Sequence, residues 1–504
     1  MNAPIGQPDP VTSIDWVHRA NALQAPWGMF VDGEQRPAIS GSVRAVLSPR
    51  DGATVVELGW ADEKDVDVAV AAARRAFDEG PWPRLPARER GEILQRLAAL
   101  VEQHRDELAL LVSLEMGKPI SHAWRIELRA LTRCLRFYGE LADKGSGEVT
   151  PTVEGELSLV TREPAGVVAA VVPWNFPLTL GGWKFAPALA AGCTVVLKTA
   201  EQSPLSMQRV AQLGLEAGLP PGVFNVLSGD GLVAGRALGE HPDVDVLTFT
   251  GSTAVGRHFL RYAADSNLKR VFLELGGKSP NIILPDAPDL DAAADTAAWA
   301  IFFNSGEMCT AGSRLVVHED VADRVVQRII ETSATWFPAD PLLATTQMGP
   351  LVSQDQRRTV EQFLDAAKSA RRTIAHGGDR PRDKGSYLSP TIVLNCETSD
   401  RIWREEVFGP VVCIRPFDDE SQMLKEVNDS PYGLSASLWT RDLDRALRVA
   451  RRVESGVLSI NSNFSVHVEA PFGGFKQSGI GRDLGMAALE GYTELKNVYI
   501  ENPV

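Results

Sequence analysis

The chain has 504 residues, of which 44% are hydrophobic and 23% charged, and its net charge is −14. This composition is typical of a soluble globular protein with two or three domains. The acidic balance argues against a nucleic-acid or anionic-membrane partner, because both require basic patches.

Five cysteines stand at positions 134, 193, 309, 396 and 413, without paired spacing. An odd, sparse set indicates a reducing cytoplasm and argues against a disulfide framework or a zinc site. The N-terminal stretch carries acids and prolines where a signal peptide needs a basic start and an apolar run. We therefore expect a cytoplasmic protein without a metal.

The first 140 residues are predicted to be largely helical, because residues 65–78 and 90–117 place apolar side chains at helical spacing. Residues 146–164 read as an extended β-ribbon, and the C-terminal "TELKNVYIEN" reads as a late strand. Isolated strands need a sheet to join, and a neighbouring subunit can supply one. We therefore expect an oligomer.

Two series of short apolar strands alternate with helices in the rest of the chain. Apolar runs without period-two alternation are typical of parallel strands covered on both faces. The pattern predicts two doubly wound α/β lobes that meet at the turn "LGGKSP" and form a ligand cleft there. The predicted strands are 167–172, 194–198, 224–227, 246–249 and 271–275 in the first series, and 281–284, 314–317, 435–439 and 457–460 in the second.

Seven stretches of the sequence, taken together, closely resemble the NAD(P)-dependent aldehyde dehydrogenase superfamily, in its hydrolytic, non-acylating branch. The resemblance runs in family order from about residue 28 to the end. The stretches are "PWNFP" (173–177), "LKTAEQSP" (197–204), "FTGSTAVG" (249–256), "LELGGKSP" (273–280), "FFNSGEMCTAGSR" (302–314), "EEVFGPV" (405–411) and "PFGGFKQSGIGRDLG" (471–485).

The resemblance implies an aldehyde dehydrogenase-like fold, with two Rossmann-like lobes and a small β-ribbon oligomerisation element. It implies an NAD-binding domain at 25–145 and 165–275, a catalytic domain at 276–476, and an oligomerisation element at 146–164 and 486–504. The implied activity is NAD-dependent oxidation of an aldehyde to the carboxylic acid by a homodimer or homotetramer.

Cys309 stands in a polar turn, which is a poor place for a buried, inert cysteine. A thiolate converts an aldehyde into the tetrahedral adduct that hydride transfer requires, and leaves a thioester that water hydrolyses. The resemblance makes Cys309 the catalytic nucleophile. The other four cysteines are interpreted as buried hydrophobes.

Two polar residues stand at predicted strand ends, which face the cleft in an α/β lobe. By resemblance Glu274 is the general base that activates water, a task that suits a partly desolvated carboxyl with a raised pKa. Asn175 follows a strand, and its amide is expected to donate to the oxyanion together with the backbone N–H of Cys309. Asn175 is also a good turn former before a helix, and both readings can hold.

The cofactor site is expected where the strand of "FTGST" meets a helix, so that N–H groups at the helix start face a pyrophosphate. By resemblance Gly251, Ser252 and Trp174 lie near the phosphates. An acid near the 2′-hydroxyl favours NAD, although a lysine beside it tolerates NADP. The remaining cofactor contacts implied are Lys198 and Glu201 at the adenosine ribose and Glu406 and Phe408 at the nicotinamide side.

Three aromatic residues match positions at which the family lines its aldehyde tunnel: Phe176, Trp183 and Phe472. Without the resemblance, all three would be interpreted as core residues. The loop "SNFSVHVEAP" (462–471) offers His467 and Glu469 to a cationic or polar aldehyde. The substrate is accordingly interpreted as an aliphatic or amino-aldehyde, as in the aminoaldehyde-type branch.

Two residues depart from the family pattern. Thr199 replaces a common proline, which is expected to matter little. Glu307 stands where the family usually has glutamine, and an anion beside a thiolate raises the thiol pKa unless it points away. We therefore expect the Glu307 carboxylate to face solvent or a cation rather than the sulfur.

Two other functions remain open. A coenzyme A-acylating semialdehyde dehydrogenase is disfavoured, because such enzymes commonly lack the acid at Glu274. A non-catalytic nucleotide-binding or structural descendant is disfavoured because Cys309, Glu274 and Asn175 are all present.

Overall fold

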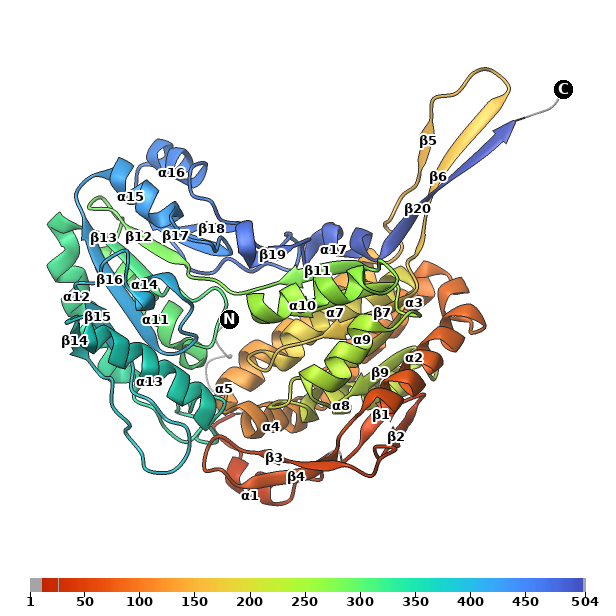
Figure 1. Cartoon of the computed structure of the whole chain (residues 1–504), viewed down its shortest axis with the longest axis horizontal. Helices are drawn as coiled ribbons and strands as arrows, with labels where there is room; N and C mark the ends of the chain where they lie inside the picture. Colours follow the sequence, from red (N-terminus) through yellow and green to blue (C-terminus); the bar gives the residue numbers. More distant parts are fainter. Residues whose placement is uncertain (1–10, 26, 502–504) are drawn as a thin grey trace.

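A computed structural model describes residues 11–25 and 27–501. Two α/β lobes lie side by side, and a narrow β-ribbon projects from the first of them (Figure 1). Among the described residues, no helix is both long and apolar enough to cross a membrane.

The first lobe is built on a sheet in which β7 to β11 run parallel and the strands at both edges are antiparallel. Its strand order reverses between β7 and β10, which is the switch point where α/β sheets bind ligands. In spatial order the strands are β19 (Gly479–Ile480), β11 (Arg270–Glu274), β10 (Val246–Thr250), β7 (Val167–Val171), β8 (Thr194–Lys198), β9 (Phe224–Leu227), β1 (Met29–Val31) and β2 (Glu34–Arg36).

Strand β7 is apolar at every position because helices cover both faces of this sheet. Val168 and Ala170 belong to one hydrophobic core, and Val167 and Ala169 belong to another. The helices of this lobe are α1 (Trp16–Asn21), α2 (Glu63–Asp78), α3 (Ala87–Gln103), α4 (Arg105–Met116), α5 (Ile120–His122), α6 (Leu128–Leu141), α7 (Pro177–Ala191), α8 (Leu205–Ala217), α9 (Arg236–Glu240), α10 (Thr253–Ala264) and α17 (Gly485–Gly491).

The second lobe contains another mostly parallel sheet, whose order reverses between β12 and β17. Its strands in spatial order are β14 (Thr373–His376), β15 (Thr391–Leu394), β16 (Val411–Phe417), β13 (Arg314–His318), β12 (Pro280–Ile283), β17 (Ser435–Trp439) and β18 (Val457–Ile460). Its helices are α11 (Leu290–Phe302), α12 (Glu319–Ser333), α13 (Gln354–Ser369), α14 (Arg401–Arg404), α15 (Glu420–Asn428) and α16 (Leu443–Ala450).

The N-terminal segment contains more sheet than its helical periodicity predicts. Strands β1 and β2 extend the first sheet, and β3 (Val43–Leu47) pairs with β4 (Thr54–Gly59). These strands are short and partly exposed, so they lack the apolar runs that mark the central strands. The projecting ribbon consists of β5 (Glu148–Thr150), β6 (Glu156–Pro164) and β20 (Thr493–Glu501), in antiparallel pairing.

The two lobes meet through opposite ends of their sheets. The first lobe contributes the carboxyl ends of β7, β10 and β11, where Asn175, Ser252 and Glu274 lie. The second lobe contributes amino ends, because Cys309 precedes β13 and Glu406 precedes β16. The carboxyl-end switch point of the second lobe is therefore at the other end of its strands.

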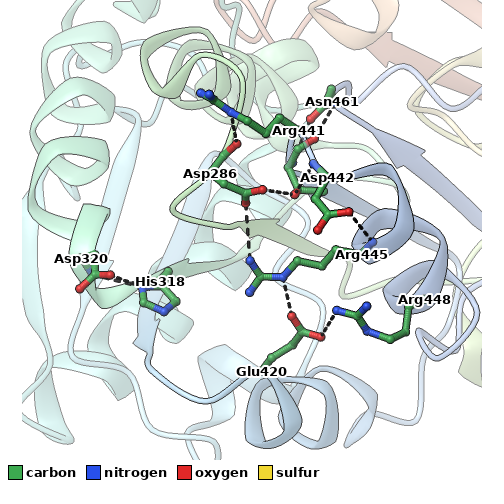
Figure 2. Close-up of polar contacts among 10 residues, drawn as sticks. Asp286, His318, Asp320, Glu420, Arg441, Asp442, Arg445, Arg448 and Asn461 are labelled. Carbon is green, nitrogen blue, oxygen red and sulfur yellow. Dashed lines mark hydrogen bonds and ion pairs between the residues drawn. The ribbon is translucent and has the colours of Figure 1, made fainter.

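That switch point is closed by polar contacts rather than left open (Figure 2). Asp286 follows β12 and accepts a hydrogen bond from Thr440 Oγ1 at 2.7 Å. Arg445 lies between the carboxylates of Asp286 and Glu420, at 3.6 Å and 2.6 Å respectively. The ion pairs join the end of β12 to α15 and α16, and the Thr440 hydrogen bond joins it to the end of β17.

Replacing Arg445 by methionine should lower the free energy of unfolding by about 1–2 kcal/mol, because two partly buried carboxylates lose their shared partner. Arg448→Met is the matched control, since Arg448 is 53% exposed and lies 3.5 Å from Glu420. Urea unfolding midpoints measure both variants. Equal shifts in the two variants would contradict a stabilising role for the closed switch point.

Candidate active site

The turn that carries Cys309 has an uncommon backbone. Directly after α11, Asn304, Ser305 and Gly306 have φ angles of 51°, 57° and 73°. Each non-glycine residue held in this region costs on the order of 1–3 kcal/mol. Only glycine fits at position 306, because a Cβ there would lie 2.1 Å from the backbone oxygen of Gly409. Surrounding contacts must therefore hold the turn.

Those contacts come from both sides of the cleft. Asn304 Nδ2 donates to the backbone oxygens of Asn175, at 3.1 Å, and Glu307, at 3.2 Å. Ser305 Oγ donates to the oxygen of Gly349 at 3.0 Å. The turn is thus tied to the first lobe by Asn175 and to the second lobe by Gly349.

Glu307 is fully buried, so its carboxyl group does not face solvent; of the two surroundings expected, the cation remains, because the charge of Lys118 acts on this group. Its Oε1 accepts a hydrogen bond from the N–H of Val352 at 3.0 Å. Burial raises the pKa of Glu307 well above its usual range, and the charge of Lys118 only partly opposes this. The neutral acid is favoured, and a neutral acid puts no negative charge beside the Cys309 sulfur.

The turn that carries Cys309 holds the side-chain amide of Asn175 in place. Its Nδ2 donates to the oxygen of Glu307 at 3.0 Å, and the residue is only 3% exposed. An amide nitrogen carries two hydrogens, so one N–H remains available to a ligand. The backbone oxygen of Asn175 also accepts from Lys118 Nζ at 3.0 Å.

Lys118 and Glu127 form a buried ion pair beneath this segment. The Lys118 ammonium lies 3.7 Å from the ring centroid of Phe176. Glu127 Oε1 accepts the N–H groups of Leu178 and Thr179 at 3.0 and 3.3 Å, where α7 begins and its dipole favours an anion. The pair therefore clamps residues 175–179 as one unit.

Glu274 ends β11 and is 5% exposed. Neither carboxylate oxygen has a hydrogen-bond partner among the described residues, and Oε1 lies where a Cβ at Gly473 would approach it to 2.7 Å. Burial raises the pKa of Glu274 well above its usual range; Asp483 adds to the rise, and Lys184 opposes it. A desolvated, unpartnered carboxyl group is suited to accept a proton.

Lys184 and Asp483 were not singled out from the sequence. Lys184 Nζ donates to Asp483 Oδ2 at 2.6 Å, and both side chains are almost completely buried. A signal was available, because Lys184 is a charged residue in α7, where every residue is buried. Its partner lies 299 positions away, so the sequence did not reveal the pair.

The Cys309 thiol is protonated near neutral pH in this arrangement. Burial raises its pKa to about 12, and the charges of Glu406 and Glu274 add to the rise. The backbone N–H groups of Cys309 and Thr310 face the sulfur and lower the pKa. The role of Glu274 beside this thiol stays a prediction.

A cavity of about 270 Å³ leads to the Cys309 sulfur. Phe176, Trp183 and Phe472, the predicted tunnel residues, all line it. His467 and Glu469 are exposed and do not line it, and Glu469 pairs instead with Arg133 at 3.2 Å. The prediction that these two residues attract a cationic aldehyde is therefore not supported by the residues that line the cavity.

On the other side of the cleft, residues suited to a dinucleotide gather at the switch point of the first sheet. Ser252 caps α10 by accepting the N–H of Val255 at 3.3 Å, so a helix N-terminus lies there. Gly251 donates its N–H to the oxygen of Glu274 at 3.0 Å. The rings of Trp174 and Phe408 are in edge contact, with their centroids 5.3 Å apart.

Two acids in this region are already engaged. Glu406 Oε1 accepts the N–H of Gly277 at 3.0 Å, and burial raises its pKa to about 7. Glu201 Oε1 accepts Lys198 Nζ at 3.0 Å and the N–H of Gly231 at 2.6 Å. The open helix start and these fixed acids fit a dinucleotide with a free ribose hydroxyl.

Comparison with known proteins gives a consistent result. A model described as the aldehyde dehydrogenase family matches residues 37–498. Aminoacetaldehyde dehydrogenase from Pseudomonas aeruginosa is 43% identical over 483 residues, which cover 96% of this chain and 97% of that protein. The NADP/NAD-dependent aldehyde dehydrogenase PuuC of Escherichia coli K12 is 43% identical over 485 residues, covering 96% and 98%.

Among solved structures, indole-3-acetaldehyde dehydrogenase of P. syringae, a mutant in complex with NAD+ and IAA, superposes with a TM-score of 0.96. It is 46% identical and covers 97% of this chain and 99% of its own. The predicted fold class and the resemblance to an aminoaldehyde-type branch are thereby confirmed.

Proposed function

Because the chain belongs to the aldehyde dehydrogenase family, whose members oxidise aldehydes with NAD, we propose that Cys309 is the nucleophile of a hydrolytic reaction that yields the carboxylic acid. The observation that carries the proposal is the position of this thiol. It lies at the end of an apolar cavity, beside the unpartnered carboxyl group of Glu274 and the turn that fixes Asn175.

The Cys309 sulfur adds to the aldehyde carbon as its thiol proton passes to solvent, which makes that carbon tetrahedral and leaves the former carbonyl oxygen as an oxyanion. The free N–H of Asn175 and the backbone N–H of Cys309 stabilise the resulting oxyanion. Removing one such donor typically lowers the rate by about 10²–10³-fold. Bound NAD would supply the hydride acceptor, and loss of the hydride from the tetrahedral carbon would leave a thioester on Cys309.

Glu274 then removes a proton from a water molecule that attacks the thioester carbon. The carboxylic acid leaves, and the sulfur takes the proton that Glu274 removed from water, which restores both groups. The Lys184–Asp483 ion pair tunes this base, because Asp483 raises the pKa of Glu274 and Lys184 lowers it. Neither residue of the pair touches the reacting atoms in this proposal.

The cofactor is held by groups already in place. Ser252, Gly251 and Trp174 are assigned to the phosphates by the helix start at α10, and Glu406 with Phe408 to the nicotinamide side. Lys198 and Glu201 are assigned to the adenosine ribose. The Glu201 carboxylate disfavours a 2′-phosphate, so NAD is the preferred cofactor, while Lys198 leaves NADP as an alternative.

We assign the larger organisation as follows. The NAD-binding domain comprises residues 25–145 and 165–275, and the catalytic domain 276–476. Residues 146–164 and 486–504, which include the projecting strands β5, β6 and β20, are assigned to the oligomerisation element of a homodimer or homotetramer, because exposed apolar side chains such as Val149 and Leu495 need a partner. The five unpaired cysteines support a cytoplasmic location.

The reaction type is tested by product analysis. With an aldehyde and NAD, the expected products are NADH and the free acid in equal amounts, with one oxygen of the acid derived from water. Adding coenzyme A should change neither, because Glu274 already delivers water to the thioester. Acyl-coenzyme A as the product would support the acylating alternative. NAD binding without NADH formation from any aldehyde would support the non-catalytic alternative.

A further inference from the structure

The cavity that leads to Cys309 has an aromatic wall that the reaction itself does not require. The rings of Trp299 and Phe303 are stacked, with centroids 4.6 Å apart and planes at 14°. The ring centroid of Phe464 lies 4.8 Å from that of Trp299, and the centroid of Phe176 lies 6.2 Å from that of Phe303. The six rings that line the cavity are those of Phe176, Trp183, Trp299, Phe303, Phe464 and Phe472.

These rings form a continuous path from the nucleophile outward. Phe176 follows Asn175 in the chain, beside the reacting end of the cavity, and Phe464 is 62% exposed at the other end. Trp183 and Phe472, which also line the cavity, are in edge contact, with ring centroids 5.1 Å apart. An aromatic ligand can therefore make offset or edge contacts along the whole path.

The wall offers no charge to a cationic ligand. Among the described residues that line the cavity, the thiol of Cys309 is the only ionisable group. An ammonium group would lose hydration there without a carboxylate to replace it, and such desolvation costs several kcal/mol for an unpaired ion. Glu469, the acid of the nearby loop, is exposed and paired with Arg133.

Attraction of a cation by the rings is also weakened. Lys118 already lies 3.7 Å from the centroid of Phe176, so this ring carries a buried ammonium group on one face. The faces of Trp299 and Phe303 that stack on each other are closed to a ligand. Each of these three rings therefore has one face already occupied, which leaves fewer ring faces for a cationic ligand.

Besides the hydroxyl groups of Thr179, Thr310 and Ser465, the described lining of the cavity carries one amide side chain, that of Asn463. Asn463 Nδ2 donates to the oxygen of Thr296 at 3.0 Å, which turns its Oδ1 toward other partners. Because Asn463 lines the cavity beside Phe464, this oxygen can accept from an N–H or O–H on a ring. The cavity volume of about 270 Å³ lies near the lower limit of small-molecule sites, which suits a single or fused ring on a short linker.

We propose that this cavity selects uncharged aldehydes that carry an aromatic ring on a short linker, the class of phenylacetaldehyde and indole-3-acetaldehyde. The inference rests on the proposed function of Cys309 and deepens it. Relatives of the chain are named for aminoacetaldehyde and for indole-3-acetaldehyde, and the chemistry of this wall favours the second kind.

A pair of isosteric aldehydes tests the charge argument. Betaine aldehyde and 3,3-dimethylbutanal differ by a quaternary nitrogen in place of a carbon, so shape is held constant. With NAD, and with concentrations corrected for the hydrated fraction measured by NMR, kcat/KM should be about tenfold or more higher for 3,3-dimethylbutanal. Phenylacetaldehyde should exceed cyclohexylacetaldehyde, because ring contacts add to area burial.

The wall itself is tested by Phe464→Ala and Trp299→Ala. Each should reduce the ratio of kcat/KM for phenylacetaldehyde over 3,3-dimethylbutanal by about fivefold or more. Phe337→Ala is the control, since Phe337 is exposed and lies outside the cavity, and it should leave the ratio unchanged.

The outcomes separate this inference from the proposed function. If betaine aldehyde is oxidised as efficiently as its neutral isostere, or if the wall variants keep the parent ratio, the substrate class is wrong while the reaction stands. If no aldehyde in the set, acetaldehyde included, yields NADH, the proposed function itself fails.

Discussion

Replacing Cys309 by alanine should lower NADH formation from every aldehyde by on the order of 10⁴-fold or more, as removal of an enzyme nucleophile does. Without the sulfur, the aldehyde carbon cannot become tetrahedral in the site, so no hydride can leave. Steady-state NADH absorbance measures the loss. NAD binding, measured by calorimetry, should persist because the residues assigned to NAD do not depend on this thiol.

Cys396→Ala is the matched control for this variant. Cys396 is 2% exposed and lies in the core of the second lobe, packed away from the cleft. Its removal is expected to cost some stability but to leave turnover measurable. Turnover near the parent level in Cys309→Ala, with loss in Cys396→Ala, would reverse the assignment of the nucleophile.

Replacing Glu274 by glutamine should slow release of the acid while hydride transfer continues. The expected loss in kcat is about 10²–10⁴-fold, the usual contribution of a general base. Glutamine keeps the shape of a buried side chain that has no hydrogen-bond partner in the described chain, so folding should be little affected. A rapid-mixing experiment should show a burst of NADH close to one equivalent per site, followed by a very slow steady state.

The pH dependence gives an independent check on Glu274. A general base works only when deprotonated, and the pKa of Glu274 is raised well above its usual range. The deacylation rate should therefore be low at acidic pH and rise as the pH passes that raised pKa. Asp483→Asn removes the charge that raises it, so the rising limb should shift to lower pH in this variant. A missing burst in Glu274→Gln would mean that Glu274 acts at an earlier step. An unshifted limb in Asp483→Asn would mean that the limb does not report Glu274 tuned by Asp483.

The central strands could be located from the sequence because helices cover both of their faces. Strands β7, β8 and β10 appear as unbroken apolar runs, and their observed bounds differ from the predicted ones by at most one residue. Strands β1 to β4 were missed: β2 and β3 keep polar side chains in contact with solvent, and β1, although buried, is only three residues long.

The candidate site residues could be predicted where a short stretch of sequence places them at a turn or at the end of a strand. Cys309, Asn175 and Glu274 each stand at a turn or strand end, and strand ends at a switch point converge. Glu307 shows the limit of that reasoning. Its neighbours in the sequence are polar, yet Val352 and the segment around Asn175 enclose it completely. Burial favours the neutral form of Glu307, and a neutral acid does not oppose ionisation of the Cys309 thiol.

The sequence by itself determined the family, the two α/β lobes and the identity of the reacting groups, because these depend on local patterns of apolar runs, glycines and strand ends. Only the tertiary structure decided the Lys184–Asp483 pair, the Lys118–Glu127 clamp and the aromatic, uncharged wall of the cavity. Each of these joins residues from separate elements, in the first case 299 positions apart. Burial then sets the charges and the pKa values, and burial is a property of the packed chain rather than of any one stretch.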